Sequence, residues 1–361
     1  MVSELSLGHQ NPAGGSAGTD ASGRDSHPRF TCPERVYTCE FCPFDAGQDL
    51  LAWGKCFRCG ESQLGVLRRE YKDDAGDAQR RWALVPVLNE MMDTRVVKIA
   101  WAPSTTCAVS SDGLEAINIK LAAVTASRKL HIIVNDQHAV YDTQHSDYIN
   151  DVAWSFSQCN VLATASDDHY CRVWSVDDGL QLLCAVQLSS PGVAVRWHPA
   201  EAGTVMVAEQ SGYLRLLNYA AAMESAPSGD GHGWKLTLQT PRNVGTLTGA
   251  DWNFGAVVGS QWYTWDMEET GQVVPDQQGE AHVEGASEFL WCPSNPRLYV
   301  TYTKVPRPSS AFRCYNTAYP QVPRVYAAPA AAPLRHMSWH AHEPLLVGCA
   351  GDKLFFWTMA S

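Results

Sequence analysis

Residues 149–175 read INDVAWSFSQCNVLATASDDHYCRVWS, and this stretch decides how the rest of the chain is interpreted. It holds three short apolar runs, at 149–154, 161–163 and 171–174. Each run has the length and the β-branched or aromatic content of a strand. Between the last two lies Ser166-Asp167-Asp168-His169, whose short polar side chains bond to nearby backbone and favour a turn. The pattern predicts a compact antiparallel sheet.

The same stretch has a His before the first run, an Asp in the second turn and a Trp at the end of the third run. It therefore resembles a blade of the WD-repeat family. In that family the His, a Ser or Thr on the second strand, the Asp and the Trp indole form one buried hydrogen-bond chain. The resemblance implies such a chain through His145, Thr164 (or Ser166), Asp168 and Trp174. A buried bond to a charged partner contributes about 1.5–3 kcal/mol, so the chain should hold one blade together.

We interpret His145 and Asp168 as structural residues and not as two members of a catalytic triad. No Ser lies in the sequence context of a nucleophile elbow, and we find no carboxylate pair or phosphate-binding loop. The sequence therefore predicts no catalytic residue and no cofactor-binding residue.

Seven segments repeat this apolar start. Each ends at a Trp, or at Phe41 in the first copy, and a turn follows. Successive Trp residues are 53, 43, 55, 39 and 48 positions apart, close to the ~40–45 residues of a propeller blade. The sequence thus predicts an all-β, seven-bladed WD-repeat β-propeller. The starts are VYTCEFCPF (36–44), VKIAWAP (97–103), INDVAWS (149–155), VAVRWHP (193–199), LTGADWN (247–253), SEFLWCP (287–293) and LRHMSWH (334–340).

The seventh copy leaves room for only three strands before the last residue. An incomplete blade exposes a strand edge, so a fourth strand must come from elsewhere. His27–Cys32 precedes the first blade, and we expect it to close the ring. The propeller domain would then span residues 27–361. Residues 1–26, rich in Gly, Ser, Ala and Asp, are expected to form a disordered tail.

The composition limits the function classes. The net charge is −11 and no run of five Lys or Arg occurs, which argues against direct nucleic-acid binding. No apolar run approaches the ~18 residues of a membrane span, so membrane insertion is not expected. Twelve Cys without an apolar leader segment predict free thiols in a reducing compartment.

Several smaller expectations follow from local composition. We interpret residues 68–81, 104–116 and 221–233 as loops, and Cys56–Cys59 as the strand that follows Leu50–Trp53. Arg172 lies between two apolar residues and is expected to face solvent. His198 and His340 follow the first-strand Trp and should mark its turn.

Two Cys-x-x-Cys pairs, Cys39 with Cys42 and Cys56 with Cys59, have the spacing of a zinc ribbon. Zinc needs four thiolates at ~2.3 Å, which requires each pair to lie in a tight turn. Both pairs fall in predicted strands, where residues three apart point to opposite faces. We therefore expect small buried thiols, with a zinc site as the less favoured alternative.

Five longer segments are more particular than the blade signature: EFCPF (40–44), SDDHYCRVW (166–174), SPGVAVRWHPAEAGTVMVAEQSGYLRL (190–216), GAVVGSQWYTWD (255–266) and HMSWHAHEPLLVGCAGDKLFFW (336–357). They resemble the nucleoporin thirty-seven family of small WD-repeat proteins, in order, over most of residues 30–358. The tail, the Cys pairs and the 221–233 loop are not part of the resemblance.

That resemblance implies a protein without enzymatic activity or cofactor, in the Y-complex scaffold of the nuclear pore outer rings at the nuclear envelope. Its partners would be other nucleoporins, chiefly the large short-arm subunit that has a propeller followed by helices. The implied role is to support pore assembly and the transport of mRNA and protein. In animals the complex also visits kinetochores in mitosis.

Two other classes stay open. A different WD-repeat adaptor, such as a ubiquitin-ligase substrate receptor or a chromatin-associated scaffold, would share the fold. One class of ligase receptor has an Arg soon after the Trp-Asp of the third strand, and neither Trp174-Ser-Val-Asp nor Trp265-Asp266-Met-Glu-Glu has it. The third class, an enzyme or a zinc-dependent module, would depend on the Cys pairs.

Overall fold

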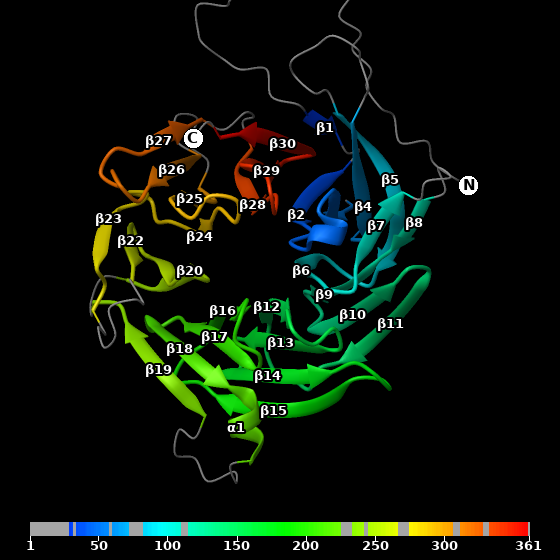
Figure 1. Ribbon diagram of the computed structural model, residues 1–361, viewed down its shortest axis with the longest axis horizontal. Coiled ribbons are helices and arrows are strands. Elements are labelled where there is room, and N and C mark those ends of the chain that lie inside the picture. Colours follow the sequence, from blue (N-terminus) through cyan, green and yellow to red (C-terminus); the bar gives the residue numbers. More distant parts are fainter. Residues whose placement is uncertain are drawn as a thin grey trace, which may run out of the picture.

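The computed structural model describes residues 29–31, 34–57, 60–71, 82–109, 115–224, 233–241, 245–265, 274–305, 311–327 and 332–359. Within these ranges the strands form seven four-stranded antiparallel sheets and one two-stranded sheet. The seven sheets stand around a central axis as the blades of a propeller (Figure 1). The predicted all-β, seven-bladed architecture is therefore confirmed. The predicted tail, residues 1–26, lies outside the described residues.

Blades 1 to 4 run in chain order from the axis to the rim. Blade 1 consists of β2 (Arg35–Phe41), β3 (Leu50–Cys56), β4 (Ser62–Tyr71) and β5 (Trp82–Met92). Blade 2 consists of β6 (Val96–Trp101), β9 (Lys120–Thr125), β10 (Lys129–Val134) and β11 (Gln137–Asp142). Blade 3 consists of β12 (Ile149–Trp154), β13 (Val161–Ser166), β14 (Tyr170–Ser175) and β15 (Gln181–Gln187). Blade 4 consists of β16 (Gly192–Trp197), β17 (Thr204–Glu209), β18 (Tyr213–Asn218) and β19 (Trp234–Gln239).

Blades 5 and 6 repeat this order. Blade 5 consists of β20 (Leu247–Asp251), β21 (Gly255–Val258), β22 (Gln261–Thr264) and β23 (Gln277–Glu280). Blade 6 consists of β24 (Glu288–Trp291), β25 (Leu298–Tyr302), β26 (Phe312–Asn316) and β27 (Arg324–Tyr326). Blade 7 has β28 (Leu334–Trp339), β29 (Leu345–Ala350) and β30 (Lys353–Thr358), and takes its outermost strand, β1 (Arg29–Thr31), from the other end of the chain.

The strand β1 closes the ring, as predicted. It pairs antiparallel with β30, and Phe30 lies opposite Leu354 (Figure 1). The Phe30 side chain is buried and lies 6.4 Å from the Trp53 ring of blade 1, centroid to centroid. β1 therefore covers the free edge of blade 7 and also packs against the neighbouring blade. Of the predicted closing segment, residues 27, 28 and 32 lie outside the described residues.

The innermost strands share a bulge near their start. In six of the seven, one extra residue is left without a partner on the second strand, which shifts the alternation of side chains by one. After the bulge, residues three and one before the Trp (or Phe41) point toward the axis, and those between them point into the blade contacts. The extra residues are Tyr37, Val97, Asn150, Val193, Thr248 and Arg335.

Several loop assignments were wrong. Residues 68–71 belong to β4, and residues 104–116 contain most of a hairpin of β7 (Thr106–Val109) and β8 (Glu115–Asn118), which packs on the 3-10 helix η1 (Asp45–Gly47). The stretch 221–233 begins inside α1 (Tyr219–Glu224) and its last residue precedes β19. A polar composition does not show whether the backbone is paired with a neighbouring strand, so it cannot distinguish a loop from a strand. Residues 72–81, 110–114 and 225–232 lie outside the described residues.

The assignment of Cys56–Cys59 to a strand was also wrong. β3 ends at Cys56, and a turn follows in which Phe57 N donates to Glu61 O (2.7 Å) and Gly60 N donates to Phe57 O (3.0 Å). Gly60 has φ = +95°, a conformation that favours glycine. Cys59 itself lies outside the described residues.

Candidate functional site

The four side chains of the expected hydrogen-bond chain lie together in blade 3. Trp174 Nε1 donates to Thr164 Oγ1 (3.0 Å), and Thr164 Oγ1 lies 2.9 Å from His145 Nε2. His145 Nδ1 lies 2.8 Å from Asp168 Oδ2. The other candidate, Ser166, accepts the Asp168 backbone N–H (3.1 Å) and so shapes the turn. The chain links the loop before blade 3 to strands β13 and β14.

The protonation states follow from the surroundings. Burial lowers the pKa of His145, so the ring stays neutral. Burial alone would raise the pKa of Asp168, but hydrogen bonds from Arg172 and His145 outweigh it and lower that pKa. A neutral ring with its proton on Nδ1 can donate to Asp168 and accept the Thr164 hydroxyl at Nε2. The chain then ends at an indole in the core, and we infer a structural role for it.

Arg172 does not face solvent, contrary to the expectation. Its Nη1 lies 2.8 Å from Asp168 Oδ2, and its guanidinium lies 4.8 Å from the centre of the Tyr170 ring. The side chain is 12% exposed. Alternation along a strand gives the face of a side chain, but a long Arg can fold back to a carboxylate at the end of its own blade.

Blade 4 holds a counterpart that sequence reasoning missed. Glu209 is fully buried, accepts the backbone N–H groups of Ser189 (2.8 Å) and Ser190 (3.0 Å), and pairs with Arg215 Nε at 2.9 Å. Arg215 lies over Tyr213 at 4.8 Å, the same arrangement as Arg172 over Tyr170. A repeated Tyr-x-Arg at the start of the third strand was the sequence signal.

Three of the Trp residues that end innermost strands connect neighbouring blades through the indole N–H. Trp101 Nε1 donates to Glu40 O (3.0 Å), and Trp197 Nε1 donates to Ala153 O (2.9 Å). Trp339 Nε1 donates to Leu290 O (3.3 Å). In each case the acceptor belongs to the innermost strand of the preceding blade. These three Trp residues therefore bond blade to blade, whereas the buried Nε1 atoms of Trp154 and Trp291 have no hydrogen-bond partner among the described residues.

As expected, His198 and His340 shape the turns that follow these Trp residues. His198 Nδ1 accepts the N–H groups of Ala200 (3.0 Å) and Glu201 (2.7 Å). His340 Nδ1 accepts the equivalent groups of His342 (3.2 Å) and Glu343 (3.1 Å).

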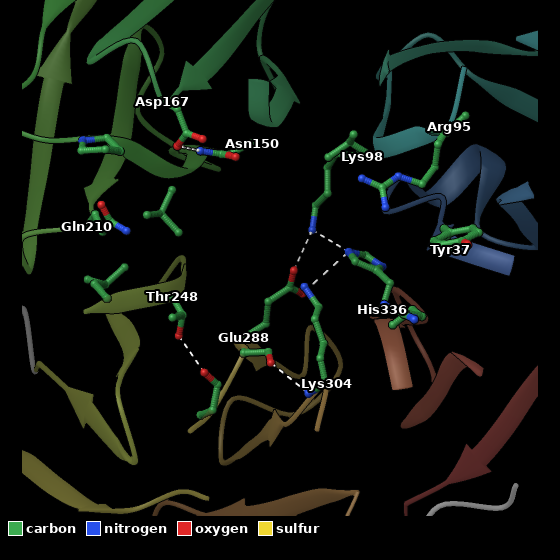
Figure 2. Close-up of a pocket in the computed structure, with 18 residues that line it drawn as sticks. Tyr37, Arg95, Lys98, Asn150, Asp167, Gln210, Thr248, Glu288, Lys304 and His336 are labelled. Carbon is green, nitrogen blue, oxygen red and sulfur yellow. Dashed lines mark hydrogen bonds and ion pairs between the residues drawn. The ribbon is translucent and has the colours of Figure 1, made fainter. Parts of the chain in front are cut away.

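Charged side chains line the central channel. Lys98 Nζ lies 3.6 Å from Glu288 Oε1 and 2.6 Å from His336 Nε2, and the three point toward one another in Figure 2. Burial and then Lys98 lower the pKa of His336 to about 3, so this ring is neutral. Burial would raise the pKa of Glu288, but Lys98 and other cations hold it well below its usual range.

A second group of charges lies on the inner strands of blades 3, 4 and 5. Arg196 pairs with Asp151 and lies 3.4 Å from Asp251 Oδ1. Asp151 Oδ2 also accepts Val195 N (2.9 Å), and Asp251 Oδ2 accepts Trp291 N (2.8 Å). These carboxylates bond the innermost strands of neighbouring blades across the channel wall. Sequence reasoning missed these residues. The signal for them was a charged residue one or three positions before the Trp at the end of an innermost strand.

The three described thiols of the candidate zinc pairs lie in different surroundings. Cys39 is buried between blades 7 and 1, where its Sγ lies 3.7 Å from His336 O. Cys42 is buried between blades 1 and 2, and burial raises its thiol pKa to about 12. Cys56 is half-buried at the end of β3, and Cys59 lies outside the described residues. Cys39 and Cys42 therefore serve separate apolar contacts.

In the described part of the chain, no group of three or more His, Cys, Asp or Glu is arranged to hold a metal ion. No helix in the same part is long and apolar enough to cross a membrane.

Similarity to known proteins agrees with these structural features. The family model described as "WD domain, G-beta repeat" matches residues 137–175, which begin at β11 and end with β14. The sequence repeat thus starts one strand before the structural blade, which is why blade 7 needs a strand from the other end of the chain.

Three curated relatives share the name Nucleoporin Nup37. The protein from Homo sapiens is 28% identical over 352 residues, covering 94% of this chain and 98% of the relative. Those from Mus musculus (28% identical) and Drosophila melanogaster (23%) each cover 90% of this chain and 94% of the relative. The similarity to these proteins extends over nearly the whole chain and the repeat match falls on the hydrogen-bonded blade 3, so the chain is a WD-repeat β-propeller that resembles the Nup37 proteins.

Proposed function

We propose that this chain is a non-enzymatic structural subunit of the nuclear pore outer-ring scaffold, the Y-complex. The observation that carries the proposal is the similarity to proteins named Nucleoporin Nup37 over nearly the full length of both chains. In this role it supports pore assembly and nucleocytoplasmic transport at the nuclear envelope, and in an animal it would accompany the complex to kinetochores.

The finer part of the proposal concerns the partner. We propose that the chain docks onto the large short-arm nucleoporin that has a propeller followed by helices. A stable scaffold contact buries apolar area. The hairpin between β26 and β27 and the strand β27 supply such area, because Tyr319, Val322 and Val325 have exposed fractions of 73%, 78% and 51%. Apolar contacts are insensitive to salt, so the complex should persist at moderate ionic strength.

Affinity capture of the full-length chain from native extract, followed by mass spectrometry, tests the proposal. We expect Y-complex nucleoporins to be recovered in moderate salt, together with a nuclear-rim signal for the fluorescently tagged chain. Recovery of a ubiquitin-ligase scaffold or of histones in their place would assign the chain to another class of WD-repeat adaptor.

A pair of matched variants tests the apolar contact. Val322→Asp places a charge on the blade 6 hairpin, and Tyr148→Asp places one on an exposed aromatic residue (56% exposed) before blade 3. We expect Val322→Asp to reduce recovery of the helical nucleoporin and Tyr148→Asp to leave it unchanged. Equal recovery with both variants would place the contact on another surface.

A further inference from the structure

The central channel opens into a cavity of about 550 Å³ on the face where each blade connects to the next. We call this opening the upper mouth. It is lined by bulged residues of the innermost strands, among them Tyr37, Asn150 and Arg335, and by the loops just before them. The bulge turns these side chains out of the blade contacts and into the opening. The residues of the blade 3 hydrogen-bond chain do not line the upper mouth.

The lining of the upper mouth carries an excess of positive charge. Both carboxylates in it have partners: Asn150 Nδ2 donates to Asp167 Oδ1 (2.6 Å), and Lys98 pairs with Glu288. The lining therefore holds four cations and two carboxylates, although the whole chain has a net charge of −11. The charged lining residues are Arg95, Lys98, Asp167, Glu288, Lys304 and Arg335.

Two arginines hold the aromatic ring at the edge of the upper mouth. The guanidinium carbons of Arg95 and Arg335 lie 5.4 and 5.7 Å from the centre of the Tyr37 ring, and Figure 2 shows Arg95 beside Tyr37. Among the described residues, neither guanidinium forms an ion pair, and both side chains are exposed. Contact with the ring holds a guanidinium in place while leaving N–H groups free. Such a planar fork binds a carboxylate through two parallel hydrogen bonds.

The site extends beyond the channel axis. A second cavity of about 560 Å³ lies where blades 7 and 1 meet and shares Tyr37 with the upper mouth; its other lining residues are Glu34, Arg35, Cys56, Phe57, Gly351 and Asp352. Tyr37 therefore separates two adjoining hollows. A single small anion would fill only the first, whereas an extended peptide, at ~3.3 Å per residue, can lie in both. The two carboxylates and one arginine of the second cavity favour uncharged residues of a bound peptide over acidic ones.

We propose that the upper mouth binds an acidic peptide segment of a partner protein. An Asp or Glu carboxylate binds Arg95 or Arg335 beside Tyr37, and neighbouring uncharged residues of the peptide cross Tyr37 into the cavity beside Phe57. A nucleic acid does not fit this surface, because a long polyanion meets the field of the whole acidic chain, whereas a short peptide meets mainly the local cations. The inference does not depend on the proposed pore role, because it concerns a different surface from the blade 6 hairpin.

Fluorescence polarisation with the full-length chain tests this site. The probes are a labelled peptide of about ten residues in which a short run of Glu is followed by uncharged residues, the same peptide with Lys in place of Glu, and a labelled single-stranded oligothymidine of similar length. We expect only the acidic peptide to bind, more weakly as salt rises. Arg95→Gln and Arg335→Gln should each raise its Kd about tenfold, as expected for loss of a charge-assisted hydrogen bond.

The matched control is Arg297→Gln, which removes an exposed arginine from the loop after β24, on the opposite face. It should leave the Kd unchanged, and melting curves of all three variants should match that of the parent chain. The proposal is wrong if the acidic peptide does not bind, if binding is equal in all three variants, or if oligothymidine binds through the same two arginines. In those cases the cations only balance the carboxylates inside the channel.

Discussion

Arg69 and Glu343, 274 positions apart, form a two-pronged ion pair that joins the first blade to the last. Arg69 Nη1 lies 2.7 Å from Glu343 Oε2, and Nη2 lies 3.0 Å from Oε1. The Arg69 Nε also donates to Asp49 Oδ1 at 2.9 Å, and its side chain is only 2% exposed. The seam that closes the ring is therefore held by a charged bond on one side and by the strand β1 on the other.

Replacing Arg69 should loosen this seam. Arg69→Met keeps the length of the side chain but removes the guanidinium, which leaves Glu343 with only the Tyr71 hydroxyl (2.7 Å) and Asp49 with only His340 (3.9 Å). We expect the free energy of unfolding to fall by about 2 kcal/mol, because the two carboxylates are part-exposed and regain water. Urea titration measures this. Lys235→Met breaks the exposed pair with Glu201 and should change the value by less than about 0.5 kcal/mol.

Removing the closing strand should affect the whole ring. A chain that begins at residue 33 lacks β1, exposes the edge of β30 and loses the contact of Phe30 with Trp53. We expect its melting temperature to fall by several degrees or more and aggregation to increase, because an open edge pairs with other chains. A chain that begins at residue 27 is the control and should melt like the full chain. Equal melting of both truncations would show that β1 does not stabilise the ring.

Asp168 tests the structural role of the blade 3 chain. Asp168→Ala leaves His145 and Arg172 facing each other without the carboxylate, so we expect the unfolding free energy to drop by about 2 kcal/mol. Thr164→Val interrupts the same chain, and the double variant should lose less than the sum of the two. Asp178→Ala, an exposed position, is the control. An unchanged melting curve for Asp168→Ala would refute the structural role.

The carboxyl group of Glu40 predicts that the stability of the folded protein depends on pH. Burial raises its pKa from the usual 4.5 to about 7, and Lys98 and Arg196 only partly oppose this. Between these values the folded state binds a proton that the unfolded state releases, so this group makes the protein less stable as pH rises. Glu40→Gln removes that component. The stability of the parent chain relative to Glu40→Gln should fall from pH 4.5 to about 7 and level off above. Urea titrations across that range measure the difference, and a constant difference would contradict the raised pKa.

Local pattern was enough to predict the number of blades, their order and the strand that closes the ring. A short strand that ends at a Trp and is followed by a turn is a local signal. Its repetition at the blade period predicts how many blades form the ring. The short seventh copy pointed to His27–Cys32 for the same reason, since an incomplete sheet has a free edge. The blade 3 residues were expected from the resemblance to a WD-repeat blade, which could be applied because their loop and strands are neighbours in the sequence.

The charged contacts were decided by the tertiary structure. Lys98 lies next to Glu288 and His336 only because the ring brings blades 2, 6 and 7 to one axis, and the bulge at the start of the innermost strands decides which residues face it. Arg69 reads as part of a polar loop, yet ring closure places it against Glu343 and buries it. The strands and their repeat depend on neighbouring residues, and so the sequence determined them. The partner of a buried charge depends on which blades meet in space, and only the closed ring decided that.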